Sequence, residues 1–183
     1  MQGWRRRWQL GWVIFSIAAA TVVLPIPAGM AQTKWVSYTP PAGWFEVEMP
    51  LTPTASQVQE ASPVGPITTY IFSVQEGGVS FSVSCSDLPL LAVQFLGADG
   101  LMGQAKASML RQQNARELSF EPATMNGLAG KRLIYETTTD GKKRTGQAFF
   151  TVSGSRLYVL DTLVPEGSEA LVQKFFQSFR LRN

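Results

Sequence analysis

The sequence contains no histidine among its 183 residues. Histidine is the commonest general base near neutral pH and the commonest protein ligand of transition metals. Its absence excludes Ser-His-acid catalysis, Cys-His catalysis and the usual zinc sites. Sites made of carboxylates alone remain open, because carboxylate pairs and all-oxygen calcium sites need no imidazole. No loop rich in Asp and Asn has calcium-binding spacing, so we expect no metal and no cofactor.

A carboxylate pair is visible in one short segment. Glu46 and Glu48 lie two residues apart, on one face of a predicted strand that ends at Pro50. This period-two placement favours a solvated strand face over a catalytic pair. We therefore expect no catalytic residue and no enzymatic activity.

Cysteine is nearly absent as well. The one cysteine, Cys85, cannot form a disulfide within the chain, so packing alone must stabilise the fold. It lies far from the amino terminus, so no lipoprotein anchor is expected. Because it belongs to the apolar side of an alternating segment, we expect a buried and unreactive thiol.

No apolar run is long enough to cross a bilayer. The uninterrupted run from Leu10 to Leu24 has about fifteen residues, and a spanning helix needs roughly twenty. The run follows Arg5–Arg7 and precedes Pro25 and the small-residue site Ala28–Ala31. A basic start, an apolar middle and a small-residue site predict a signal peptide, residues 1–31, cleaved after Ala31. A retained anchor is the alternative, and the export route is left open.

The net positive charge of the sequence comes entirely from that segment. Removing residues 1–31 removes three of the 16 Lys and Arg and none of the 13 Asp and Glu, so the formal net charge falls from +3 to zero. A strong positive charge is typical of nucleic-acid binders, so we expect no nucleic-acid partner. The remaining residues, 32–183, are enough for one domain with its own hydrophobic core.

The first half of this domain has the pattern of strands separated by Pro and Gly, from Trp35 to Ser86. In residues 79–86, four apolar side chains alternate with four serines, which predicts a half-buried strand. Gly77-Gly78 joins this strand to the alternating segment 70–74, and the two segments are expected to form a hairpin.

A helix is predicted over residues 99–114, with Asp99 at its start. Its apolar residues recur at helical spacing, so one side should lie on a sheet. These residues are Leu101, Met102, Ala105 and Met109.

The second half predicts four strands, 117–124, 131–138, 144–152 and 156–164, and a closing helix after Pro165. Asn126-Gly127 and Asp140-Gly141 are typical of tight hairpin turns. Strand 156–164 is apolar on both faces, so both sides of the sheet should be covered. The closing helix carries an apolar stripe that should face the sheet. The predicted fold class is α+β, an antiparallel β-sheet sandwiched between helices.

This order of segments resembles the PsbP family, the extrinsic lumenal proteins of photosystem II and their relatives in oxygenic phototrophs. The resemblance is carried by the opening strand 43–50 (GWFEVEMP), the meander 130–160 and the ending 175–179 (FFQSF). It implies an α/β/α sandwich and a non-enzymatic role in binding or assembling a membrane complex. Metal sites in the family rely on histidine, which this chain lacks. DcrB-like envelope proteins share the fold, so a periplasmic, stress-associated role without a photosynthetic partner is the alternative.

A partner surface is predicted at the hairpin tip that carries Lys142, Lys143 and Arg144. Three adjacent cations steer a protein toward an acidic partner. The alternative is an ordinary solvated turn.

A second candidate surface consists of Trp35, Tyr38 and Trp44, since aromatic side chains are favoured as interface anchors. The alternative is that these rings pack on the core. The expected partner is a protein of a membrane complex, in the thylakoid lumen or the periplasm. Membrane contact is expected to be peripheral or through an uncleaved signal.

Overall fold

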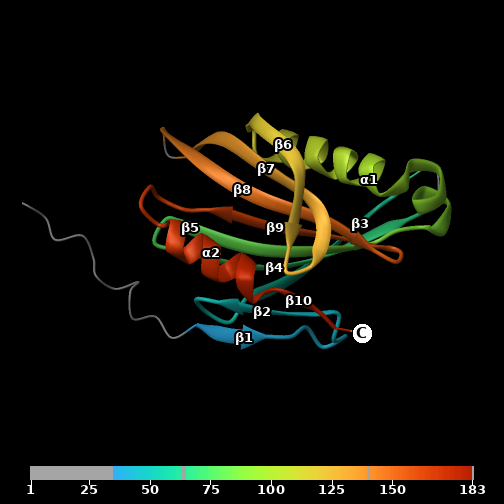
Figure 1. Cartoon of the computed structure of the whole chain (residues 1–183), viewed down its shortest axis with the longest axis horizontal. Helices are drawn as coiled ribbons and strands as arrows, with labels where there is room; N and C mark the ends of the chain where they lie inside the picture. The colour runs from blue at the N-terminus through green and yellow to red at the C-terminus, as the bar shows by residue number, and fades with distance from the viewer. Residues whose placement is uncertain (1–34, 63–64, 140, 183) are drawn as a thin grey trace, which may run out of the picture. The chain divides into compact units, whose positions relative to one another are not determined.

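Seven strands pair in one antiparallel sheet in the order β3-β4-β5-β9-β8-β7-β6 (Figure 1). The structure is a computed structural model that describes residues 35–62, 65–139 and 141–182. The predicted signal peptide 1–31 and the turn residue Asp140 lie outside the described residues. The strand bounds are β3 Thr54–Glu60, β4 Ile67–Glu76, β5 Val79–Asp87, β6 Arg116–Met125, β7 Leu128–Thr139, β8 Lys142–Ser153 and β9 Arg156–Leu163.

A second, smaller sheet joins the two ends of the described chain. It contains β1 (Val36–Tyr38), β2 (Phe45–Met49) and β10 (Arg180–Leu181), with β2 in the middle. β10 pairs antiparallel with β2, and Leu181 lies opposite Phe45. The sequence pattern did not predict this sheet.

The predicted hairpins are confirmed. Asn126 and Gly127 have φ values of 52° and 81°, and Gly77 and Gly78 have 57° and 81°. Two successive residues with positive φ form the turn type that matches the twist of paired strands. β6 and β7 therefore meet at Asn126-Gly127, and β4 and β5 at Gly77-Gly78.

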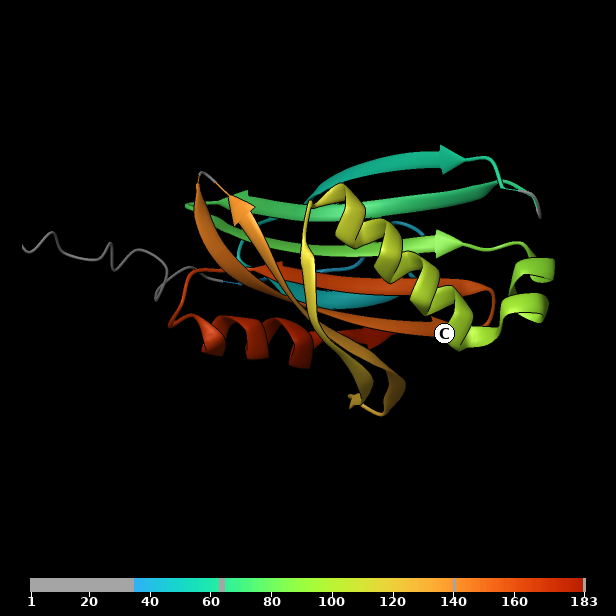
Figure 2. The ribbon, with the colours of Figure 1, turned by 90° about the horizontal axis from the view of Figure 1, so that it is seen from above.

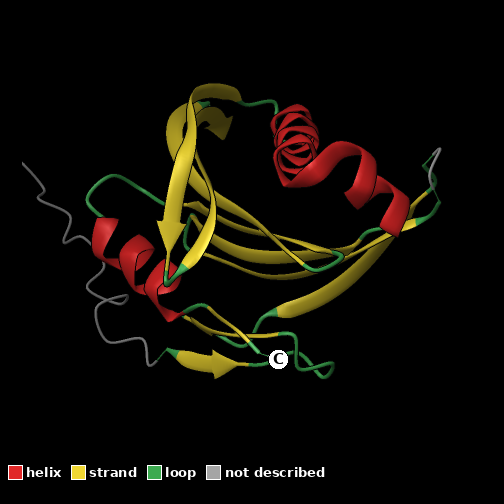
Figure 3. Ribbon diagram, turned by 45° about the vertical axis from the view of Figure 1, so that its right-hand side comes forward, coloured by secondary structure: helices red, strands yellow, loops and turns green. Residues whose placement is uncertain are grey.

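The two faces of the large sheet are covered by different elements (Figure 3). One face, called here the closed face, packs against α2 (Glu169–Ser178) and the small sheet. The other, called here the groove face, carries α1 (Leu90–Gln112). The predicted α+β sandwich is confirmed, and the small sheet is an addition to it.

Aromatic rings fill the closed face. Phe45 of β2 contacts Phe72 of β4 at 5.5 Å between ring centroids, and Phe81 of β5 contacts Phe175 of α2 at 5.2 Å. Phe175 and Phe179 are fully buried, so the closing helix faces the sheet as predicted. Cys85 is also fully buried on this face, as expected.

The middle helix begins earlier than predicted. α1 starts at Leu90 after Pro89, nine residues before Asp99, and Gly97 interrupts it with φ 62° and ψ 175°. Asp99 lies two residues after this break, so the second helical part begins close to the predicted start. The Asp99 carboxylate pairs with Lys131 at 3.0 Å. Residues 90–96 are apolar on several sides, so they lack the amphipathic periodicity that marked the later part.

Seen from above, α1 crosses the strands diagonally and leaves part of β3, β4 and β5 uncovered (Figure 2). Leu101 and Met102 of α1 are buried against Leu133 and Phe150 of the sheet. Neither helix in the described part of the chain is long and apolar enough to cross a membrane.

Candidate functional site

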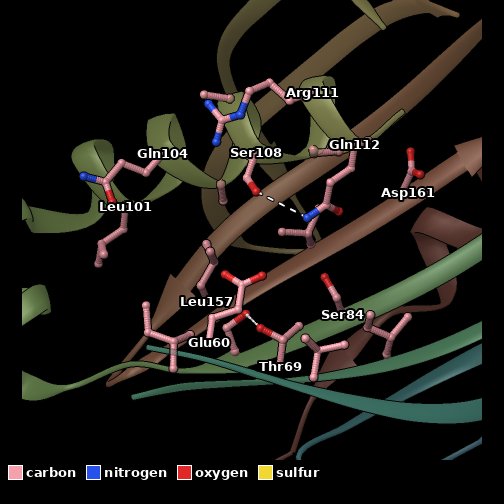
Figure 4. A pocket seen from close by; sticks show the side chains of 18 of the residues that line it. Glu60, Thr69, Ser84, Leu101, Gln104, Ser108, Arg111, Gln112, Leu157 and Asp161 are labelled. Carbon is pink, nitrogen blue, oxygen red and sulfur yellow. Dashed lines mark hydrogen bonds between the residues drawn. The ribbon is translucent and has the colours of Figure 1, made fainter. Parts of the chain in front are cut away.

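A groove of about 640 Å³ lies between α1 and the strands β3, β4, β5 and β9 (Figure 4). It exists because α1 packs over the β7 and β8 side of the sheet, through Leu133 and Phe150, and crosses the rest at an angle. Its size falls within the roughly 300–1,000 Å³ typical of small-molecule sites.

The floor of the groove contains the serine side of β5. Ser82, Ser84 and Ser86 alternate with the fully buried Phe81, Val83 and Cys85, so they point to the opposite face of the sheet. Ser86 shares a hydrogen bond of 2.8 Å with Thr69 of β4. The hydroxyls of Ser82 and Ser84 form no hydrogen bond with another described residue, so they are available to water or a ligand.

The wall of the groove is the second part of α1. Gln104, Ser108 and Gln112 recur every four residues and line it, and Gln112 Nε2 donates to Ser108 Oγ at 3.4 Å. Figure 4 shows these side chains above the floor, with Arg111 near them. Apolar side chains complete the lining, so the groove suits a ligand with both an apolar and a polar part.

One acidic residue of β9 lines the groove, at the right-hand end of the view in Figure 4. Asp161 of β9 accepts a hydrogen bond from Tyr135 Oη at 2.8 Å and another from Gln113 Nε2 at 2.9 Å. Tyr135 reaches it by lying across Gly146 of β8, where a Cβ atom would overlap the tyrosine ring. Residues from β7, the end of α1, and β9 thus meet at one carboxylate.

Burial raises the pKa of Asp161 to about 6, and the hydrogen bonds from Tyr135 and Gln113 oppose this rise. The same site raises the pKa of Tyr135, because its phenol is buried beside a carboxylate. Near neutral pH the tyrosine therefore keeps its proton and donates it to Asp161. A paired-carboxylate site of the glycosidase type would need a second carboxylate at this point. Glu60, the other acidic lining residue, lies on β3 at the exposed edge.

An exposed apolar segment lies at one end of the groove face. The helical residues 90–96 carry four large apolar side chains that are exposed: Leu90, Leu91, Phe95 and Leu96. Phe95 is 79% exposed and Leu90 is 71% exposed. The segment follows the end of β5 and stops at the kink at Gly97. We call it the apolar segment.

The predicted basic hairpin tip lies at the opposite end of β5. Lys142 and Lys143 are exposed, and Lys143 Nζ lies 3.3 Å from a carboxylate oxygen of Glu136. Arg144 donates to the backbone carbonyl of Gly78, in the turn before β5. Glu136 therefore offsets part of the positive charge of this turn, and Arg144 connects the turn to the β4–β5 turn. Its role as a partner surface stays a prediction.

The three predicted aromatic residues are each partly buried and pack on rings of the large sheet. Trp35 meets Phe81 at 5.6 Å, and Tyr38 meets Phe72 at the same distance. Trp44 meets Tyr70 at 4.8 Å. These rings line the outer border of the closed face, and their use as partner anchors stays a prediction.

Two cations also cover these rings. Lys174 lies 4.7 Å from the Trp35 centroid, and Arg156 lies 4.4 Å from the Trp44 centroid. Such cation–π contacts hold the rings against the domain and reduce their availability to a partner.

The carboxylate pair considered in the sequence, Glu46 and Glu48 of β2, forms ion pairs at the surface. Glu46 pairs with Arg182 at 3.3 Å and Glu48 pairs with Lys174 at 3.4 Å.

Burial raises the pKa of Cys85 to about 12. Within the described residues, no group of three or more His, Cys, Asp or Glu side chains is arranged to hold a metal ion.

Sequence reasoning missed Asp161, Tyr135, Gln113 and the apolar segment. A signal for Asp161 was available: it is the one acidic residue in the apolar strand 156–164, which was expected to be covered on both faces. A charge in such a strand needs a partner or a function. No local signal identified Tyr135 or Gln113, because their meeting point depends on how α1 crosses the sheet.

No protein-family model matches the sequence, and no curated protein sequence matches it. Solved structures do match. Cyanobacterial PsbP (CyanoP) from Synechocystis sp. PCC 6803 is 19% identical, over 82% of this chain and 94% of that chain, with a TM-score of 0.57. This likeness establishes the fold, in agreement with the expectation from the sequence.

Two more distant structures also match. A protein from Pseudomonas aeruginosa described as a putative regulator is 11% identical, over 81% of this chain and 98% of that chain, with a TM-score of 0.42. LpqN, involved in cell envelope biogenesis of Mycobacterium tuberculosis, is 14% identical, over 82% of this chain and 91% of that chain, with a TM-score of 0.35.

Proposed function

We propose that this chain is an exported, non-catalytic accessory protein that binds a protein of a membrane complex through its apolar segment. The observation that carries the proposal is the exposure of Leu90, Leu91, Phe95 and Leu96 on one short helical stretch. Large contiguous apolar patches are rare on monomeric soluble proteins and mark interaction sites.

The chemistry of the segment favours a protein partner over a lipid surface. Residues 88–98 contain no charged side chain. Helices that lie on membranes carry Lys and Arg beside their apolar face, whereas the centres of protein interfaces are poor in charge and rich in aromatic residues. Asp99, whose side chain is 80% exposed, begins the polar border of the patch. We therefore expect a complementary apolar patch on the partner.

The choice of complex rests on the resemblance of the sequence to the PsbP family. It favours photosystem II, with the chain in the thylakoid lumen. A complex in the bacterial envelope, with the chain in the periplasm, is the alternative. The likeness in fold does not decide between the two choices, because fold alone does not determine function.

The experiment compares two double variants. Leu91→Ser with Phe95→Ser removes apolar surface at exposed positions, and Lys142→Ser with Lys143→Ser changes the basic hairpin tip, which is the competing candidate surface. Co-sedimentation with the native membranes should weaken more than tenfold for the first variant, because buried aromatic anchors each contribute about 2 kcal/mol or more. It should remain near the parent level for the second.

Two further measurements separate the alternatives. Flotation with protein-free vesicles, neutral and anionic, should show no binding of the parent protein. Analytical ultracentrifugation should show the same mass for the parent and the Leu91→Ser, Phe95→Ser variant. Equal co-sedimentation of that variant, strong vesicle binding, or a parent dimer that the variant loses would each overturn the proposal.

A further inference from the structure

Asp161 is a partly buried carboxylate without a counter-ion. Its oxygens accept hydrogen bonds from two neutral donors, Tyr135 Oη and Gln113 Nε2. Seven ion pairs occur among the described residues, and none includes Asp161. An unpaired charge inside a protein is costly, and such groups concentrate at functional sites.

The groove around Asp161 has more acidic than basic groups. Glu60 of β3 and Arg111 of α1 are the other charged residues in its lining, and both are exposed at its margin. Tyr135 of β7 is the titratable group in direct contact with Asp161, and it stays neutral because burial raises its pKa. From β5, Ser82 lies opposite Asp161 in register and contributes a neutral hydroxyl.

An apolar track leads away from this carboxylate along β9. Val159 and Leu157 lie on the same face as Asp161, and both line the groove. Ser84 of β5 lies beside Val159, and Ile71 of β4 lies beside Ser84. The track from Asp161 to Leu157 spans four residue-to-residue steps along the strand, which is about 13 Å. An extended chain of eight carbon atoms fits within this length.

We propose that the groove binds a small organic cation with an aliphatic body, whose ammonium group lies against Asp161 and whose chain lies over Val159 and Leu157. The ammonium group supplies the counter-ion that Asp161 lacks, and its other donors meet the Ser82 hydroxyl. An ammonium has three N–H donors, so one group can donate to both the Asp161 carboxylate and the Ser82 hydroxyl. The inference is independent of the apolar segment and its partner.

The test uses three probes of the same chain length with the purified protein: n-octylamine, n-octanol and octanoate. Titrations followed by amide chemical shifts should show octylamine binding at least tenfold more tightly than octanol, because a hydrogen bond to a charged group is stronger than one between neutral groups. Octanoate should bind most weakly. The shifts should map to β5, β9 and the second part of α1.

Two variants locate the charge effect. Asp161→Asn should bring octylamine to the affinity of octanol, while Glu60→Gln, at the exposed edge, should leave the preference within threefold. A preference for octylamine that survives in Asp161→Asn would overturn the proposal. So would equal binding of octylamine and octanol by the parent.

The pH dependence of the parent protein gives a readout that needs no variant. Because the pKa of Asp161 is about 6, its carboxyl is mostly protonated at pH 5. Octylamine should therefore bind about tenfold more weakly at pH 5 than at pH 7.5, while octanol binding stays constant. Octylamine affinity that does not change over this range would also contradict the proposal.

Discussion

The two faces of the seven-stranded sheet differ although the same strands form both. On β5, Phe81, Val83 and Cys85 are fully buried on the closed face, whereas Ser82 and Ser84 line an open groove on the other. α2 and the small sheet cover the first face with aromatic rings, and α1 covers the second only in part. The comparison suggests that one face provides the stability and the other leaves room for binding.

The largest difference in stability is expected between variants of two phenylalanines, one on each face. Phe175 on α2 is fully buried against Phe81, and Phe95 in the apolar segment is 79% exposed. Phe175→Ala should lower the free energy of unfolding by about 3–5 kcal/mol, because it leaves a cavity in a packed core. Phe95→Ala should change it by less than about 0.5 kcal/mol. Urea unfolding at constant pH measures both, and similar losses in the two variants would remove the distinction between the faces.

A smaller effect should appear with pH on the groove face. The pKa of Asp161 is about 6 in the folded protein, above the usual 3.8. The folded protein therefore binds more protons than the unfolded chain between these values, and stability falls as the pH rises through them. Between pH 5 and pH 7.5 the loss should be roughly 1.4 kcal/mol.

Urea unfolding of the parent and of Asp161→Asn across this range isolates that contribution, since the variant lacks the titrating group. Glu136 does not interfere, because its Lys143 contact lowers its pKa from 4.5, so its own effect appears at more acidic pH. Two results would contradict the assignment of an unpaired carboxylate. One is a free energy of unfolding of the parent that is constant between pH 5 and pH 7.5. The other is the same pH dependence in the parent and in Asp161→Asn.

The smallest effect is expected at the basic hairpin tip. Lys143 pairs with Glu136 at 3.3 Å, but its side chain is 76% exposed, and Lys142 is exposed as well. Replacing both by Ser should change the free energy of unfolding by less than about 0.5 kcal/mol, because exposed ion pairs contribute little. If the melting temperature of this double variant fell as far as that of Phe175→Ala, the turn would also be needed for stability.

The strands and α2 of the closed face were predictable from local pattern, whereas the small sheet that also covers this face was not. Alternation in residues 79–86 identified the buried side of β5, the turn residues Asn126-Gly127 located a hairpin, and the stripe around Phe175 indicated the face of α2. Each of these signals is contained in a few neighbouring residues, so secondary structure and burial follow directly from them.

The groove face was less predictable because it depends on distant segments. The start of α1 at Leu90 was missed, since its first residues are apolar without a helical stripe. The contact among Tyr135, Asp161 and Gln113 joins three elements, and it also requires Gly146 to leave space for a ring. No periodicity in the sequence records the angle at which a helix crosses a sheet.

The pairing of β10 with β2 affects the order in which the molecule is completed during synthesis. Phe45 lies near the start of the described chain, and its partners Leu181 and Phe179 are among its last residues. At a synthesis rate of roughly 5–20 residues per second, β2 waits on the order of ten seconds for these partners. Until they leave the ribosome, Phe45 lacks Phe179 and Phe81 lacks Phe175, so the closed face stays incomplete. The packing of α2 and β10 can therefore begin only after nearly the whole domain has been made.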